Sequence, residues 1–177
     1  GYGLSYTSFE YSDLHATPTG VSLTVKNTGA MAGDEVVQVY ISKPDARIFR
    51  PMQELKGFAR VHLEAGESKL VSIPLDDKAF RYWNDPAGHW AVEGGSYTVR
   101  VGACSEDIRL ESTVTVESSG DSDPYAGCAT PHYFSGQVQD VPDDEFAVLL
   151  RHPIPREKIS IDRNMTLGEI GHGRSPL

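Results

Sequence analysis

The feature that most constrains this chain is a two-residue alternation of apolar and polar side chains in short runs. It is clearest on either side of a break at residues 64–67, where the apolar positions are Val61, Leu63, Val71, Ile73 and Leu75. Successive side chains of a β-strand point to opposite faces, so each run offers one apolar face. The pattern predicts strand, turn and strand, and this pair needs a second sheet to cover its apolar face.

The same signal recurs along the first two thirds of the chain. Runs with a strand-like pattern occupy residues 8–14, 21–25, 36–41, 59–63, 69–75, 79–83, 89–92, 96–102 and 108–116. Glycine, proline and asparagine separate the runs, and no helical periodicity competes with them. Roughly seven to nine short strands at about ten-residue spacing are typical of an immunoglobulin-type β-sandwich. We therefore predict an all-β fold, with residues 1–117 as the sandwich.

The alternation also selects the side chains that should fill the core. The predicted core residues are Val21, Leu23, Val25, Val37, Val39, Val61, Leu63, Val71, Ile73, Tyr97, Val99, Val101, Val114 and Val116. Residues 36–41 are almost wholly apolar, which predicts a central strand that is buried on both faces or ends under a loop. Tyr97 follows a glycine turn at the start of a late strand, so we interpret it as the tyrosine corner of the sandwich.

The segment before residue 59 has the composition of a loop. Residues 50–53 form a proline-containing connector, in which Arg50 is expected to be exposed. Residues 55–58, with the sequence LKGF, are interpreted as a turn that leads into the next strand. A connector of this kind is expected to contact another domain.

Composition shifts at Glu117. Residues 118–124 are small, polar and acidic, which indicates a linker or an exposed edge loop before a C-terminal extension over residues 125–177. In this mainly irregular extension, residues 142–151 begin with acidic side chains and predict a short helix. Because a helix of this length is unstable alone, we expect Phe146 and Leu149 to be mostly buried.

Two further patterns lie near the C-terminus. Residues 159–161 alternate as in a brief extended piece, and residues 166–169 have the spacing of a capping box that would open another helix. Cys104 and Cys128 are too few for a disulfide scaffold, so we interpret both as free thiols.

The overall charge limits the partners. The chain has 25 acidic and 16 basic residues, for a formal net charge of -9, and its basic residues form no cluster. This balance argues against nucleic acid or an anionic membrane as a partner. No apolar run approaches the ~20 residues that a membrane-spanning helix needs.

The sequence contains no recognisable catalytic or metal-binding constellation. Acidic residues adjoin one another at 34–35, 76–77, 106–107 and 143–145. Neighbours on a strand face opposite sides, and the other pairs belong to loops or to the first turn of a helix. The histidines have neither the i, i+4 nor the HxH spacing of a metal site. We predict that the chain has no catalytic residues and binds neither a metal nor a cofactor.

Four motifs in this order carry a family resemblance. They are GYGLSY at residues 1–6, VKNTG and GDEVVQVY within 25–40, RPMQELKGF at 50–58 and EGGSYTVRVG at 93–102. Together they resemble the fibronectin type III-like domain of glycoside hydrolase family 3, the β-glucosidase and β-xylosidase family. The resemblance covers roughly residues 1–116 and implies a fibronectin type III-like sandwich. The chain opens without an initiating methionine or a signal peptide, so we interpret it as a piece of a longer protein.

The resemblance implies a non-catalytic accessory domain of a family 3 glycoside hydrolase. The implied parent is a β-glucosidase that hydrolyses terminal β-D-glucosyl residues in carbohydrate metabolism. Its retaining reaction needs two carboxyl groups ~5 Å apart, which the family keeps in other domains. The partners of this chain should therefore be the catalytic domains of the parent, and the piece alone should be inactive. Self-association is an alternative partner, and the compartment stays open between the bacterial cytoplasm, which we favour, and secretion.

The residues that match the motif loops of the family form the expected interface with the catalytic domains. They are Gly1, Tyr2, Gly3, Leu4, Ser5 and Tyr6, as the lead-in from a catalytic domain, and Arg50, Pro51, Glu54, Leu55, Lys56, Gly57 and Phe58. In this interpretation the domain packs against the rest of the enzyme and stabilises it.

Two other functions are open to a sandwich of this kind. One is a carbohydrate-binding module, in which Tyr82, Trp83 and Trp90, with Phe80 and Tyr125 beside them, form an aromatic platform. A coplanar pair of exposed tryptophans would favour this function, whereas tryptophans that only anchor a hairpin would not. The other is a protein-binding adhesion module of fibronectin type, which would rest on the fold alone.

Overall fold

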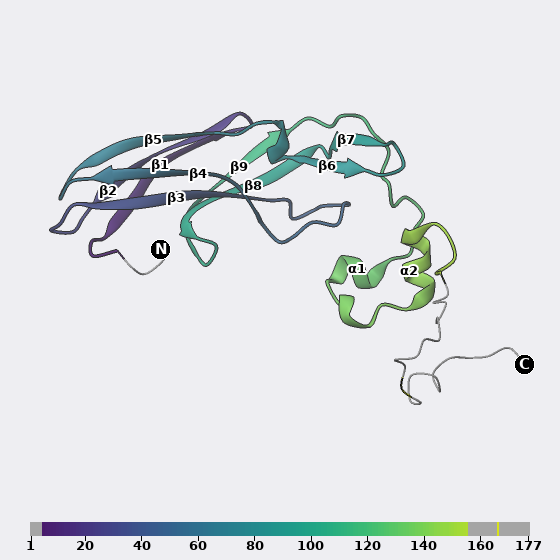
Figure 1. Cartoon of the computed structure of the whole chain (residues 1–177). Coiled ribbons are helices and arrows are strands. Elements are labelled where there is room, and N and C mark those ends of the chain that lie inside the picture. The colour runs from purple at the N-terminus through teal and green to yellow at the C-terminus, as the bar shows by residue number, and fades with distance from the viewer. Residues whose placement is uncertain (1–4, 156–165, 167–177) are drawn as a thin grey trace, which may run out of the picture. The chain divides into compact units, whose positions relative to one another are not determined.

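The computed structural model of this chain describes residues 5–155 and residue 166 (Figure 1). It divides into two compact units, residues 1–126 and residues 127–177, each of which is described by itself. The expected interface residues Gly1, Tyr2, Gly3 and Leu4 lie outside the described residues, as do the extended piece at 159–161 and most of the capping box at 166–169.

The first unit is a β-sandwich, so the predicted all-β fold is confirmed. Within the described residues, one sheet has the strand order β1-β2-β5 and the other has the order β4-β3-β8-β9, with every pair antiparallel. The strands of the first sheet are β1 (Phe9–Thr17), β2 (Gly20–Asn27) and β5 (Ser68–Pro74). Those of the second are β3 (Gly33–Ser42), β4 (Glu54–Leu63), β8 (Gly95–Cys104) and β9 (Asp107–Val116).

A smaller hairpin extends one end of the sandwich. It consists of β6 (Arg81–Asn84) and β7 (His89–Val92), and a short 3-10 helix, η1 (Asp77–Ala79), leads into it. After β9 the chain passes along this hairpin (Figure 1), where the backbone nitrogen of Ser119 donates to the carbonyl oxygen of Val92 over 3.1 Å. The start of the segment 118–124 is thus hydrogen-bonded to β7 as an edge loop.

The core lies between the two sheets, because the alternation in each strand places its apolar side chains on the facing sides. The predicted core is confirmed apart from Val61 and Val116, which are only partly buried against it. The expectation that residues 36–41 are buried on both faces holds only in part: Val37, Val39 and Ile41 face the core, whereas Val36 is exposed on the outer face. One-sided burial is usual for an antiparallel sheet.

The interpretation of residues 55–58 as a turn is wrong, because they belong to β4. Gly57 pairs with Val39 and Leu55 pairs with Tyr40, so Lys56 is the extra residue of a β-bulge. An added Cβ at Gly57 would lie 2.7 Å from Cγ2 of Ile73, so this position faces the core at very short range. A glycine inside a strand often marks such a bulge or a close approach rather than a turn.

The tyrosine corner is confirmed. The Tyr97 hydroxyl donates to the carbonyl oxygen of Glu93 over 2.6 Å, and its ring packs edge-to-face on Phe80 with centroids 5.1 Å apart. Tyr97 is fully buried at the start of β8, and burial raises its pKa to about 12. The bond fixes the chain where it turns into β8.

The second unit contains α1 (Pro131–Ser135), a 3-10 turn η2 (Val138–Asp140) and α2 (Asp143–Leu150), which confirms the predicted helix at 142–151. The expectation that Phe146 is mostly buried is wrong: its side chain is 41% exposed, and Leu149 is only partly buried. The buried residue of α2 is Glu145, whose carboxylate accepts from the backbone nitrogen of His132 over 2.9 Å and contacts the imidazole of His132 at 2.5 Å. This contact at the start of α1 sets the face that α2 turns inward.

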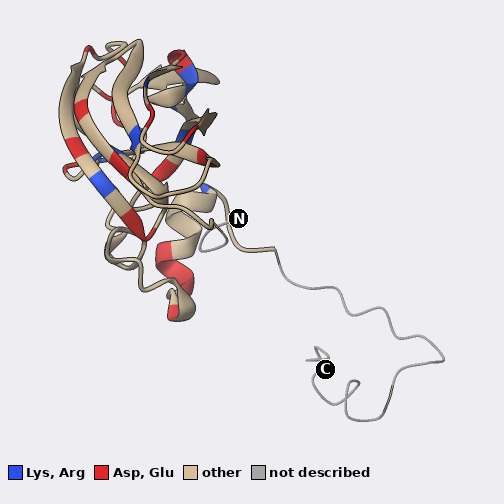
Figure 2. Ribbon diagram, turned by 90° about the vertical axis from the view of Figure 1, so that its left-hand side faces the viewer, with Lys and Arg blue, Asp and Glu red and all other residues tan. Residues whose placement is uncertain are grey.

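Among the described residues, no helix is long and apolar enough to cross a membrane. Cys104 and Cys128 are both free thiols, as the sequence indicated. Basic residues are scattered singly over the strands in Figure 2, in line with the absence of a basic cluster in the sequence.

Candidate docking surface

Arg50 lies in the connector between β3 and β4, and its side chain points into the domain. Only 9% of this side chain is exposed, so the expectation of an exposed Arg50 is wrong. Its Nη2 donates to the carbonyl oxygen of Phe80 over 3.0 Å, and its Nη1 lies 3.7 Å from Oε2 of Glu54. A guanidinium can be buried when such acceptors replace its water.

Aromatic rings and a second carboxylate complete the surroundings of Arg50. The guanidinium carbon lies 5.8 Å from the ring centre of Tyr82 and 5.9 Å from that of Tyr97. Nε of Arg50 lies 4.0 Å from Oε2 of Glu93, whose other oxygen accepts from the backbone nitrogen of Arg47 over 2.7 Å. Arg50 therefore ties the connector to the β6–β7 hairpin and to the start of β8.

The residues that follow Arg50 present apolar side chains to solvent. Directly opposed residues on paired strands point to the same face. Phe58 is opposite Gln38 and Leu55 is opposite Tyr40, and these two β3 residues alternate with the core residues of that strand. Phe58 and Leu55 therefore lie on the outer face of the four-stranded sheet. The bulge at Lys56 makes this possible, since without the extra residue Leu55 would point to the core.

We call Leu55, Phe58 and Val36 the β4 patch. Phe58 is 68% exposed, and Leu55 and Val36 are exposed beside it. Met52, in the connector just before β4, is 88% exposed. Sequence reasoning missed Val36 and Met52, although strict alternation from the buried Val37 would have placed Val36 outside. Large apolar side chains gathered on one face are the usual sign of a protein contact surface.

Polar groups next to the β4 patch are already bound to one another. Nε2 of Gln38 donates to the carbonyl oxygen of Ala103 over 2.6 Å, and the Tyr40 hydroxyl donates to Oε1 of Gln38 over 2.5 Å. Arg60 donates to Asp34 over 2.8 Å, and this hydrogen bond lowers the pKa of the Asp34 carboxyl. The patch is therefore an apolar surface with a satisfied polar border, which suits docking rather than chemistry.

The other expected interface residues are placed differently. Ser5, Tyr6 and Pro51 are exposed. Glu54 and Lys56 form an ion pair of 3.0 Å and are partly buried. The motif RPMQELKGF thus contains two kinds of residue. Arg50 and Gly57 make contacts inside the domain. Pro51, Leu55 and Phe58 face outward.

The aromatic residues of the expected sugar platform do not share one plane. Trp83 and Trp90 are directly opposite on the β6–β7 hairpin and are 49% and 53% exposed. Their ring centres are 5.5 Å apart, but their planes meet at 78°. The Arg81 guanidinium lies 4.4 Å from the centre of the Trp90 ring. Tyr82 is the neighbour of Trp83 on β6, so it points to the other face of that strand.

Phe80 and Tyr125 do not extend this platform. Phe80 is buried under Tyr97, and Tyr125 stacks on Phe49 with ring centres 4.1 Å apart. The exposed tryptophan pair is therefore edge-to-face, with one ring covered in part by an arginine. A flat sugar face packs best on coplanar rings, so this geometry does not favour a stacking platform at the hairpin.

Several carboxylates that are adjacent in the sequence have structural partners. Asp76 caps η1 by accepting from the backbone nitrogen of Lys78 over 2.9 Å, and Asp77 pairs with Arg81 at 3.1 Å. Asp107 pairs with Arg109 at 2.8 Å, and hydrogen bonding from this arginine lowers the pKa of the Asp107 carboxyl. In the part of the chain that the structure describes, no group of three or more His, Cys, Asp or Glu side chains could hold a metal ion.

Comparison with known families identifies a domain in the middle of the chain. Residues 35–105, from β3 to the end of β8, match the model of the fibronectin type III-like domain. This range includes the β4 patch residues Leu55 and Phe58, together with Arg50 and Tyr97.

Curated relatives are much longer than this chain. Thermostable beta-glucosidase B of Acetivibrio thermocellus is 38% identical over 165 residues, which cover 89% of this chain and 21% of that enzyme. The beta-glucosidase of Kluyveromyces marxianus is 53% identical over 123 residues, 66% of this chain and 15% of its own length. The chain thus spans about a fifth or less of these relatives. The match to the A. thermocellus enzyme is longer than residues 1–117, so it includes part of the C-terminal extension.

Among solved structures, too, this chain matches one part of longer β-glucosidases. The GH3 beta-glucosidase of Bifidobacterium adolescentis has a TM-score of 0.64 and 40% identity, over 68% of this chain and 19% of that one. The beta-glucosidase of K. marxianus has a TM-score of 0.59 and 48% identity, over 66% of this chain and 15% of that one. In both, the matched region is one part of a much larger chain.

Proposed function

Because this chain contains the fibronectin type III-like domain of glycoside hydrolase family 3 β-glucosidases, we propose that it packs against the catalytic domains of a larger enzyme and stabilises them. The proposed parent hydrolyses terminal β-D-glucosyl residues. In this proposal the chain supplies no catalytic group, since the two carboxylates of a retaining reaction belong to other domains.

The observation that carries this proposal is the β4 patch. Phe58 and Leu55 are exposed on a strand whose backbone geometry is fixed by a bulge and by the buried side chain of Arg50, in the connector before it. An exposed phenylalanine that a domain holds rigidly gives up little side-chain entropy on docking, which makes it an effective contact residue. The matched relatives are about five times as long, and in them this domain is one part of a larger chain, which supports packing against other domains.

The interface that we propose therefore differs from the motif list. Leu55, Phe58, Pro51 and Met52 would contact the catalytic domains directly, and residues 1–6 would form the connection to one of them. Arg50 and Gly57 would act from inside the domain, by holding the connector and the bulge in place.

A single charge on the β4 patch tests the proposal. In the full-length protein that includes this chain, Phe58→Glu should place a carboxylate in an apolar interface and shorten the half-life of thermal inactivation several-fold. The matched control is Leu70→Glu, because Leu70 is also strongly exposed but lies on β5 of the other sheet. When the two substitutions are made in this chain alone, both variants should have the melting temperature of the wild type.

If Phe58→Glu inactivates no faster than Leu70→Glu in the full-length protein, the β4 patch is not the docking surface. If Phe58→Glu lowers the melting temperature of the isolated chain as much as that of the full-length protein, its effect is internal to the sandwich, and the proposal loses its support.

A further inference from the structure

A hollow of about 450 Å3 lies at the hairpin end of the sandwich, apart from the β4 patch. Its walls come from four segments: the connector after β3, strand β6, the end of β7 with the turn into β8, and the chain that returns along β7 after β9. Lys43, Asp45 and Arg47 form one side, and Glu93, Asp121 and Asp123 lie on the other walls with Tyr82. The volume is in the range of small-molecule pockets, about 300–1,000 Å3.

The walls of this hollow are fixed by hydrogen bonds. The backbone nitrogen of Arg47 donates to Oε1 of Glu93 over 2.7 Å, and Nδ2 of the buried Asn84 donates to the carbonyl oxygen of Ser122 over 3.2 Å. Gly94 lets the returning chain approach, because an added Cβ there would lie 2.8 Å from the backbone nitrogen of Ser118. A site whose walls are held in this way needs little reorganisation to bind a ligand.

The charges around the hollow nearly balance. Glu93 lies 4.0 Å from Nε of Arg50, and Asp121 lies 2.7 Å from Nε2 of His89. Hydrogen bonds from Ser119 and then His89 lower the pKa of the Asp121 carboxyl. The remaining charged groups are two cations, on Lys43 and Arg47, and two anions, on Asp45 and Asp123.

Three side chains that line the hollow have unused hydrogen-bonding capacity. Among the described residues, the Asp45 carboxylate has no ion-pair or hydrogen-bond partner, and the Lys43 ammonium only lies over the Tyr97 ring at 4.9 Å. Asp123 has one oxygen bound to the backbone nitrogen of Tyr125, which leaves acceptor capacity on the other. Donor and acceptor thus face the same space, beside an aromatic ring at Tyr82.

This combination selects the class of ligand. An anion such as phosphate would meet the carboxylates, and the described carboxylates do not group as a metal site requires. A neutral hydroxylated molecule fits, because each hydroxyl can donate to a carboxylate and accept from an ammonium. We propose that this hollow binds a small neutral polyol, with the apolar face of a monosaccharide ring against Tyr82 and its hydroxyls on Asp45, Asp123 and Lys43.

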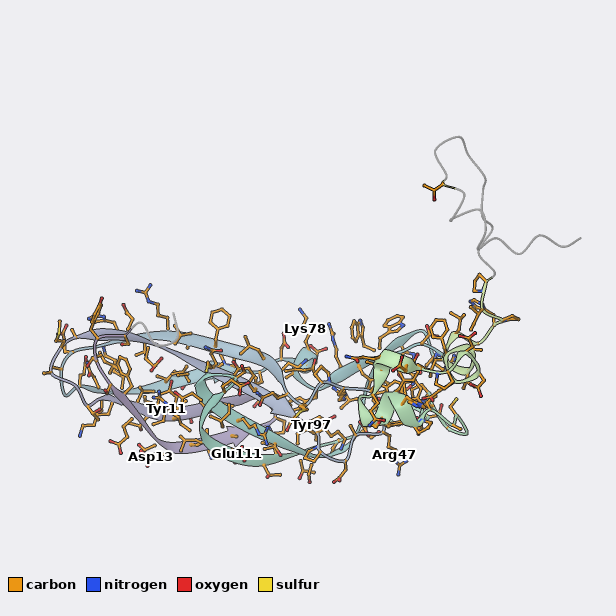
Figure 3. The ribbon with its side chains drawn as sticks, turned by 90° about the horizontal axis from the view of Figure 1, so that it is seen from below. Tyr11, Asp13, Arg47, Lys78, Tyr97 and Glu111 are labelled. Carbon is orange, nitrogen blue, oxygen red and sulfur yellow. The ribbon has the colours of Figure 1, made fainter. Side chains whose placement is uncertain are left out.

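The test is an amide chemical-shift titration of the 177-residue chain with D-glucose and, separately, with myo-inositol, to about 100 mM. Saturable shifts should appear at the backbone amides of Gly94, Gly95 and Ser118, with a Kd of about 1–10 mM, since the hollow is open and the ligand small. Asp45→Asn and Lys43→Met should each weaken binding about five-fold. The control is Lys78→Met, because Lys78 does not line the hollow and extends from the opposite side of the domain to Arg47 (Figure 3).

Folding is checked by melting each variant. Lys43→Met removes a contact with Tyr97, so Asp45→Asn, which removes no hydrogen bond or ion pair among the described residues, is the decisive variant. The proposal is overturned if neither polyol gives saturable shifts, or if Asp45→Asn binds as tightly as Lys78→Met. It is equally overturned if glycine, spermidine or inorganic phosphate saturates these amides and the polyols do not.

Discussion

At the scale of single residues, the polar side chains inside the sandwich are the informative ones. Arg50 is the centre of one buried set, in which the carbonyl oxygen of Phe80, the carboxylate of Glu93 and two tyrosine rings surround a guanidinium. Oε2 of Glu93 and Nε of Arg50 have no hydrogen-bond partner among the described residues, so their mutual attraction is what offsets the loss of water.

Replacing this arginine should therefore cost more than removing a surface charge. Arg50→Met keeps the aliphatic stem but leaves the Glu93 carboxylate without its counter-charge, and we expect unfolding to become easier by about 2–3 kcal/mol. Urea denaturation of the isolated chain measures this. Arg47→Met is the control, because Arg47 is held through its backbone nitrogen, which the substitution keeps. Equal midpoints for the two variants would contradict the role of Arg50.

Tyr97 predicts a loss of stability in alkali. Burial raises its pKa to about 12 in the folded state, whereas an unfolded tyrosine titrates near ~10. Between these values the folded chain holds a proton that the unfolded chain releases, so the free energy of unfolding falls as pH rises from about 10 to about 12. Urea midpoints across this range should fall, and they should fall less steeply in Tyr97→Phe.

The same substitution separates two effects. At pH 8, Tyr97→Phe loses the hydrogen bond to the carbonyl oxygen of Glu93 and should be less stable by about 1 kcal/mol. If its alkaline slope equals that of the wild type, the titrating group is another tyrosine. Tyr11, Tyr40 and Tyr82 are the alternatives, since burial also raises the pKa of each.

At the scale of elements, the bulge in β4 decides what the domain presents to a partner. It turns Leu55 and Phe58 to the same face, although they are three positions apart and would point to opposite faces of a regular strand. Gly57 lies against Ile73 of the opposite sheet, so both sheets contribute to this geometry. The element that docks is thus shaped by the packing of the core.

A methyl group at this position should disturb that packing. In Gly57→Ala the new Cβ would lie 2.7 Å from Cγ2 of Ile73, and we expect a loss of about 1–3 kcal/mol from overpacking. A double-mutant cycle measures the coupling, because Ile73→Ala removes the atom that clashes. In that background Gly57→Ala should cost little. Strict additivity would mean that the strain arises in the backbone of the bulge instead.

At the scale of the whole molecule, the chain is a sandwich followed by a small helical unit, and it spans about a fifth of its relatives. Asp76, Asp77 and Asp107, three of the carboxylates that the sequence places side by side, are used in a helix cap and in ion pairs. An accessory role accounts for the exposed apolar β4 patch of this domain.

The corresponding prediction concerns activity. The isolated chain should not hydrolyse 4-nitrophenyl β-D-glucoside above the uncatalysed rate, because a retaining glycosidase needs two carboxyl groups ~5 Å apart that face one substrate. A sample purified from a host without β-glucosidases provides the measurement. Turnover that follows the protein through purification and disappears on mutation of one acidic pair would contradict the accessory role.

The sequence by itself determined the class of fold, the strands and most of the core. It could do so because burial of one face imposes a two-residue period that each run of residues carries locally. The tyrosine corner and the helix at 142–151 were also predictable, because a glycine turn before Tyr97 and acidic residues before Phe146 act over a few positions.

Only the tertiary structure decided whether Arg50, Leu55 and Phe146 point into the fold or toward solvent. Arg50 turns inward because acceptors from residues 80 and 93 converge on it, and Leu55 turns outward because a bulge shifts the register by one residue. Phe146 is exposed because Glu145 takes the inward position on α2 to bind His132. These outcomes depend on contacts between segments far apart in sequence, whose free energies exceed any local preference.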